Sequence, residues 1–158
     1  SATPPKKGRA VAIPQFARPN ADITDGNWTK STGGNIDLFT MIDEVVADDV
    51  DFIQSALAPV NDAAAMHLSD VEDPLVSTGH IVRYRFQKSA AAGAQIDLIV
   101  QLRQGYTAEA TQGTLIHAET HTNIGNPWTA GTFTLSGAEA DAITNYNDLQ
   151  VRLNANQV

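Results

Sequence analysis

The chain has 158 residues, of which 42% are hydrophobic, and its ten basic and eighteen acidic side chains give a formal net charge of −8. This length is typical of one domain that buries a substantial core. The absence of cysteine excludes disulfides, thiolate catalysis and cysteine-ligated zinc. No apolar run approaches the roughly 20 residues of a membrane-spanning helix, so we expect no membrane partner.

Residues 1–20 predict an extended arm. They hold four of the ten basic residues and four prolines, and proline disfavours both helix and central strand. VAIPQFARP (11–19) lacks the apolar core of a signal peptide, which disfavours Sec-type secretion. Its apolar side chains suit an arm that binds a partner, because a disordered tail usually lacks them. A flexible terminus without a partner is the alternative. The candidate partner-binding residues are Lys6, Lys7, Arg9, Val11, Ile13, Phe16 and Arg18.

The body of the chain, residues 21–158, is strongly acidic. From residue 19 onward there are six basic and eighteen acidic residues, a net charge of −12. An acidic surface repels phosphate backbones, so we expect no nucleic-acid binding by the body. Asp-Gly and Gly-Gly pairs predict loops over residues 21–35, with Trp28 covering an edge of the core. Strands are expected over 35–45, through 52–57 and, more weakly, over 64–68.

The stretch 79–105 carries the clearest β pattern. Val82, Tyr84 and Phe86 alternate with arginines, and apolar residues of 96–102 alternate with polar ones. Such alternation predicts strands with one buried and one wet face. The small residues SAAAGA between the two strands suit a hairpin loop, so we expect the strands to pair with each other.

The C-terminal third predicts three further strands and one short helix. The strands are expected over 115–122, 132–137 and 149–153, and Ser136 with Glu139 has capping-box spacing for one or two helical turns. About eight short strands with frequent turn signals predict an all-β, antiparallel, jelly-roll-like sandwich as one domain, residues 21–158.

The strongest candidate for a metal site is the set His117, Glu119 and His121, because alternate residues of a strand share one face. The two histidines would lie roughly 13 Å apart along a strand, too far to share one zinc ion. We therefore expect a polar outer face and no metal site. The acidic runs 43–51 and 70–73 lack the spacing of an EF-hand, so solvated loops are favoured over structural calcium.

No motif in the sequence indicates an enzyme. There is no G-x-S-x-G elbow, no P-loop and no dinucleotide fingerprint. We therefore expect no catalytic residues and no cofactor. A glycan-binding module is the stronger competitor, because such modules use aromatic side chains in or beside loops. The candidate glycan contacts are Trp28, Tyr106, Trp128 and Tyr146, which core packing explains equally well.

Three of the six basic residues of the body fall on the polar faces of the stretch 79–105. Arg83, Arg85 and Arg103 are therefore candidate subunit contacts. Pairing with an acidic loop of the same subunit is the favoured alternative, and an exposed pair of this kind contributes little stability.

Much of residues 20–155 resembles a domain of virion structural proteins of tailed bacteriophages. The resemblance lies in ADITDGNW (21–28), IDEVVADDVDFI (42–53), LSDVEDP (68–74), STGHIVRYR (77–85), IDLIVQLRQG (96–105) and NPWTAGTFTLSGAEADAITNYNDLQVRL (126–153). It implies a non-enzymatic β-sandwich on the virion, assembled in the host cytoplasm: a capsid decoration (cement) protein, or a tail or fibre component. The implied partners are the major capsid protein and further copies of this chain, as a homo-oligomer such as a trimer.

Overall fold

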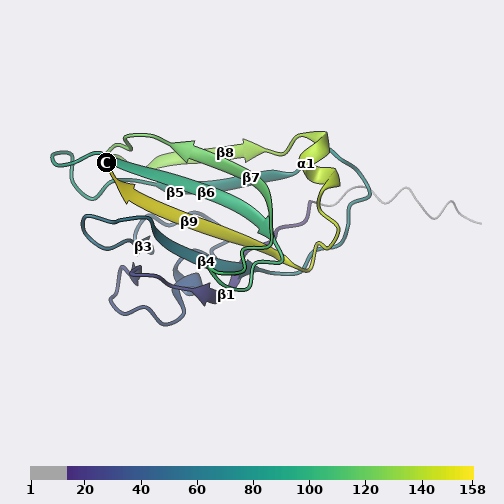
Figure 1. The fold of residues 1–158 in the computed structure, drawn as a ribbon, viewed down its shortest axis with the longest axis horizontal. Helices are drawn as coiled ribbons and strands as arrows, with labels where there is room; N and C mark the ends of the chain where they lie inside the picture. The colour runs from purple at the N-terminus through teal and green to yellow at the C-terminus, as the bar shows by residue number, and fades with distance from the viewer. Residues whose placement is uncertain (1–13) are drawn as a thin grey trace, which may run out of the picture.

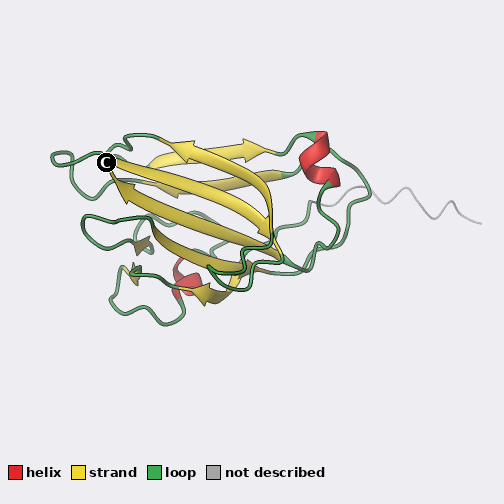
Figure 2. Ribbon diagram, viewed as in Figure 1, coloured by secondary structure: helices red, strands yellow, loops and turns green. Residues whose placement is uncertain are grey.

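The computed structural model describes residues 14–158, and antiparallel strands dominate this part of the chain (Figure 1, Figure 2). The elements in chain order are β1 (Pro19–Thr24), β2 (Thr29–Lys30), the 3₁₀ helix η1 (Leu38–Met41), β3 (Ile53–Gln54), β4 (Asp62–Leu68), β5 (Ile81–Phe86), β6 (Ile96–Gln104), β7 (Thr114–His121), β8 (Thr129–Thr134), α1 (Gly137–Asp141) and β9 (Leu149–Gln157).

Two layers of strands enclose the core. The larger sheet has the order β1-β4-β9-β6-β7, and β5 pairs with β8 in a separate two-stranded sheet. Aromatic contacts join the two sheets: the His117 ring of β7 stacks on Phe133 of β8, with 4.4 Å between ring centroids. The expected all-β sandwich with one short α-helix is therefore confirmed.

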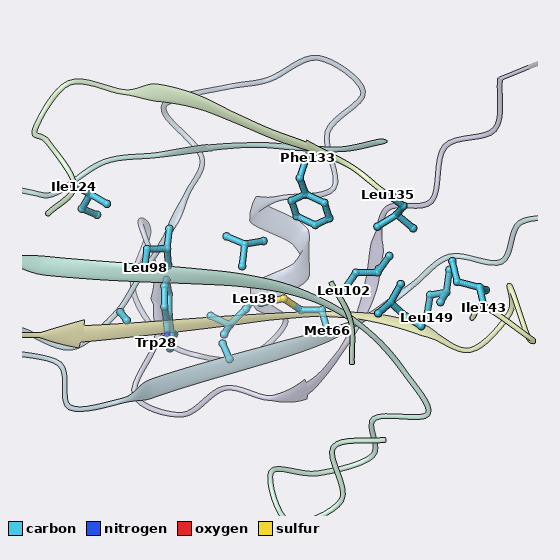
Figure 3. Close-up of a cluster of buried hydrophobic side chains, with 14 of the residues drawn as sticks. Trp28, Leu38, Met66, Leu98, Leu102, Ile124, Phe133, Leu135, Ile143 and Leu149 are labelled. Carbon is cyan, nitrogen blue, oxygen red and sulfur yellow. The ribbon is translucent and has the colours of Figure 1, made fainter. Parts of the chain in front are cut away.

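The core lies between these sheets and extends to the N-terminal segment (Figure 3). Val100 in the middle of β6 and Met66 on β4 are almost fully buried. Leu38 of η1 is also fully buried, and the indole nitrogen of Trp28 donates to the backbone carbonyl of Asp62 at 3.0 Å. Burying these side chains supplies the main favourable free energy of folding.

The stretch 79–105 forms two strands but not a hairpin, so that expectation was wrong. β5 pairs with β8, whereas β6 pairs with β7 and β9, so the two strands belong to different sheets. The connection 87–95 passes from one layer to the other. It is held by the turn before β8, because the Lys88 N–H donates to the Gly125 carbonyl at 2.7 Å.

Two expectations near the N-terminus were also wrong. Residues 35–45 form no strand; η1 lies there instead, because the Asp22 carboxylate accepts hydrogen bonds from the N–H groups of Leu38 and Phe39. The loop expected over 21–35 begins as strand β1, which pairs with β4. The Asp22 side chain, sixteen residues before Leu38 in the sequence, therefore stabilises η1.

The loop 105–113 folds over the outer face of the larger sheet and buries a polar cluster there. Tyr106 is 2% exposed, and its hydroxyl donates to Glu109 at 2.5 Å. Arg152 of β9 makes two hydrogen bonds to the same carboxylate, both 2.8 Å long. Both faces of the larger sheet are therefore partly covered. The alternation of apolar and polar residues along its strands does not predict this cover on the outer face.

Within residues 14–158, the structure contains no helix that is both long and apolar enough to cross a bilayer.

The packing of Gly131 against Tyr84 gives a test of the β5–β8 sheet. These residues are directly opposite, and a Cβ on Gly131 would overlap the Tyr84 ring. We expect Gly131→Ala to lower the free energy of unfolding by about 1–3 kcal/mol through overpacking, measured by urea denaturation. Gly125→Ala is the matched control, because its Cβ would meet only Pro127 Cδ, at 3.6 Å. Equal stability of the two variants would contradict this packing.

Candidate functional site

The root of the N-terminal arm, residues 14–18, is anchored to the segment that follows β4. Gln15 makes two hydrogen bonds to the backbone of Glu72, one as donor at 3.0 Å and one as acceptor at 2.7 Å. The Arg18 N–H donates to Ser69 Oγ, and the Ser69 N–H donates to the Arg18 carbonyl. The sandwich therefore fixes the position at which the described chain begins.

Two of the predicted arm residues lie in this root. Phe16 is 60% exposed, and the Arg18 guanidinium lies 5.0 Å from the centre of its ring, a cation–π contact. An exposed phenyl ring beside a cation is available to a partner surface. The other candidates, Lys6, Lys7, Arg9, Val11 and Ile13, lie outside the described residues.

A cleft of about 530 Å³ opens beside the arm root. Three segments form its walls: the root, through Gln15; the segment 70–73 after β4; and the segment 144–147 between α1 and β9. Tyr146, one of the four predicted aromatic contacts, lines this cleft. Its hydroxyl lies 2.7 Å from His80 Nε2. No motif marks the cleft in the sequence, because its walls come from three distant segments.

The cleft is electronegative. Asp70, Glu72 and Asp73 line it, and within residues 14–158 none of the three is in a salt bridge. Burial raises the pKa of Tyr146, and the negative charges of Asp73 and Asp141 raise it further. Both effects disfavour an anionic phenolate. The site therefore suits a cationic occupant and repels an anion.

The four candidate glycan contacts do not form one surface. Trp28 is 7% exposed and Tyr106 is 2% exposed, so both belong to the packed interior. Trp128 packs edge-on against Phe52, with ring centroids 5.7 Å apart. Only Tyr146 of the four lines the cleft. Packing therefore accounts for three of these aromatic residues.

The three candidate arginines are also separated. Arg83 and Arg85 lie on β5, whereas Arg103 lies on β6 in the other sheet. Arg85 makes a bidentate ion pair with Asp49 of an acidic loop, at 2.7 and 2.9 Å. Arg103 bonds to Gln101 of its own strand at 2.8 Å. The expected pairing with an acidic loop of the same subunit is therefore present for Arg85.

His117, Glu119 and His121 share one strand face as expected, but that face is the inner one. The expectation of a polar outer face was wrong, because His117 stacks on Phe133 and His121 lies against Phe86 with ring centroids 4.3 Å apart. His121 Nε2 also lies 2.6 Å from the Tyr84 hydroxyl. Burial, with the charge of Glu119, raises the pKa of Tyr84 to about 12, so this hydroxyl stays neutral.

His117 lies between two carboxylates. Its Nδ1 is 2.5 Å from Glu139 Oε2 on α1, and its Nε2 is 3.0 Å from Glu119 Oε2. A neutral imidazole has only one N–H, so two carboxylate partners require the imidazolium form. Burial lowers the pKa of His117, but the hydrogen bonds and charges of Glu119 and Glu139 outweigh it and the net shift is upward.

Glu139 links this ion cluster to α1. Its Oε1 accepts from the Ser136 N–H at 2.8 Å, while Ser136 Oγ accepts from the Glu139 N–H, so the predicted capping box is present. One carboxylate thus caps α1 and binds His117 on β7. With both ring nitrogens engaged, His117 is not available as a general base. Within residues 14–158, no group of three or more potential ligands has metal-site geometry.

Comparison of the chain with protein-family models, with curated proteins and with solved structures gives no match.

The His117 cluster predicts a pH dependence of stability. The folded-state pKa is raised, so the stabilisation is fully present below the unfolded value of about 6.5 and is lost as pH rises through the folded value. We expect wild type to lose stability relative to His117→Gln between about pH 6 and pH 9. Urea unfolding of both proteins across this range measures it, and a pH-independent difference would contradict the prediction.

Proposed function

We propose that this chain is a non-enzymatic structural protein of a tailed-bacteriophage virion. The first choice is a capsid decoration protein whose N-terminal arm, residues 1–20, lies on the shell. Its partners would be the major capsid protein and neighbouring copies of the same chain in a homo-oligomer. The resemblance of residues 20–155 to phage virion domains supports this proposal, and so does the division of the chain into a basic arm and an acidic body.

The observation that carries the proposal is the anchored arm root. The hydrogen bonds of Gln15 and Arg18 attach residues 14–18 to the segment 69–72. β1 continues from this root and pairs with β4, which pairs in turn with β9. An arm held in this way transmits its binding energy to the folded body. Extended segments contact a large area per residue, and many copies on one particle add avidity.

The alternative is a glycan- or receptor-binding module of a tail or fibre. Tyr146 favours it, because a half-buried tyrosine lines a cleft with polar walls. The cleft offers one of the four predicted aromatic contacts, and the others pack elsewhere. An electronegative cleft also suits a cation better than a neutral or acidic sugar. For these two reasons the glycan- or receptor-binding module is the second candidate.

Deletion of residues 1–13 tests the arm. It leaves the hydrogen bonds of Gln15 and Arg18 intact, whereas deletion to residue 20 would also remove the start of β1. We expect the shortened chain to keep its thermal unfolding midpoint but to lose binding to purified particles, measured by co-sedimentation. Full occupancy by the shortened chain would contradict the arm proposal.

Copy number and glycan binding separate the two candidates. Quantitative mass spectrometry of purified particles should give hundreds of copies for a shell protein and a handful for a tail protein. A glycan array with wild type and Tyr146→Ala tests the alternative, with Trp128→Ala as the matched aromatic control. Glycan binding that is lost only in Tyr146→Ala would favour the module over decoration.

A further inference from the structure

We propose that the free edge of β7 pairs with β7 of a second copy of this chain, so that the larger sheets of the two copies join across a two-fold axis. The interaction surface is residues 117–121. The inference goes beyond the proposed virion role, which includes a homo-oligomer but no surface for it. Purified chain tests the pairing, so its failure leaves the proposed binding of the arm to particles untouched.

β7 is an edge strand of the larger sheet, whose order is β1-β4-β9-β6-β7 (Figure 1). β8 packs against the inner face of β7 through Phe133 and does not pair with this edge. Within residues 14–158, the backbone of β7 makes hydrogen bonds to β6 and to no other strand or loop. Alternate residues of an edge strand direct their N–H and C=O groups away from the sheet. β7 therefore presents a row of unpaired donors and acceptors to which a further strand can add.

The opposite edge of the same sheet is protected against such pairing. β1 begins at Pro19, and its register with β4 is irregular at two places. η1 lies beside β1, held by the Asp22 carboxylate. Proline, bulges and covering segments are common means by which edge strands avoid pairing with other chains. β7 has neither proline nor lysine, and residues 117–121 pair with β6 without irregularity.

The side chains of β7 favour a second β7 as the occupant. A two-fold interface uses the same surface on both copies, and side chains directly opposite in an antiparallel pair share one face. An axis at Ala118 places His117 of each copy opposite Glu119 of the other. His117 is an imidazolium and the Glu119 side chain is 37% exposed, so these charges are complementary across the axis. On the outer face Ala118 and Thr120 are exposed and uncharged, so two acidic bodies can approach there.

The same side chains determine the register of the pairing. An axis at Glu119 would place two carboxylates directly opposite each other, which destabilises a sheet. An axis at Thr120 would place His117 opposite Asn123, whose φ of 52° is left-handed and therefore unsuited to a strand. The axis at Ala118 avoids both conflicts.

Cysteine cross-linking tests the pairing directly, because the chain has no cysteine of its own. In the proposed dimer the two Ala118 residues are directly opposite, with Cα atoms about 4.5–5.5 Å apart, a separation that a disulfide can bridge. We expect Ala118→Cys to form a covalent dimer on mild oxidation, detected by non-reducing electrophoresis. Thr120→Cys is the matched control on the same edge, because its two copies would lie roughly 13 Å apart along the strands. Equal cross-linking of the two variants, or none in Ala118→Cys, would overturn the proposal.

Sedimentation velocity measures the pairing without a covalent bond. We expect wild type to dimerise reversibly at submillimolar concentration in about 0.15 M salt, which screens the repulsion between two acidic bodies. Ala118→Lys should weaken the dimer by about fivefold, because two like charges would face each other at the axis. Ala21→Lys is the matched control, because it adds the same charge at an exposed position of the other edge strand, β1.

The two lysine variants separate a local effect from a general one. Each makes the net charge of −8 less negative, so a general charge effect would strengthen association in both. Weakening confined to Ala118→Lys, with an unchanged thermal unfolding midpoint, supports pairing at β7. Equal association of the two variants, or a wild-type chain that stays monomeric, would overturn it. If Ala118→Lys does not fold, the cross-linking of Ala118→Cys decides the question.

Discussion

The packing of the small β5–β8 sheet across β7 and β6 is the contact on which the rest of the structure depends. An isolated two-stranded sheet is marginal in water, so these strands need the larger sheet to stay folded. Phe133 and Tyr84 provide the apolar part of the contact. The stacked His117 and the hydrogen-bonded His121 provide a polar part in the same layer. The polar residues His117 and His121 lie on the inner face of β7 because their rings pack against Phe133 and Phe86.

The position of α1 follows from that contact. Glu139 caps α1 and binds His117, so the helix is tied to β7 by the same side chain that starts it. The segment from α1 to β9 then lines the cleft, and its backbone is held by Gln104 of β6. Gln15 of the arm root lines the same cleft. The sandwich therefore determines both the place at which the arm begins and the electronegative surface next to it.

The arginines of the described chain and the carboxylates of the cleft differ in whether they have a partner. Arg85 and Arg152 make bidentate pairs with carboxylates of the acidic body, and Arg18 stacks on Phe16 at the arm root. The carboxylates of the cleft have no such partner within residues 14–158. Uncompensated charge of one sign on one wall raises the free energy of the folded body through self-repulsion.

The sequence by itself determined the class of the fold, several strands and the cap of α1. These features depend on neighbours along the chain: alternation marked β5, β6, β7 and β9, and the spacing of Ser136 and Glu139 marked the helix start. Only the tertiary structure decided which strands pair, because alternation shows that one face is buried but not what buries it. For the same reason His117 was expected on the outer face, η1 was expected as a strand, and the cleft was not foreseen. Each depends on a contact between residues far apart in sequence, such as Asp22 with Leu38 or Gln15 with Glu72.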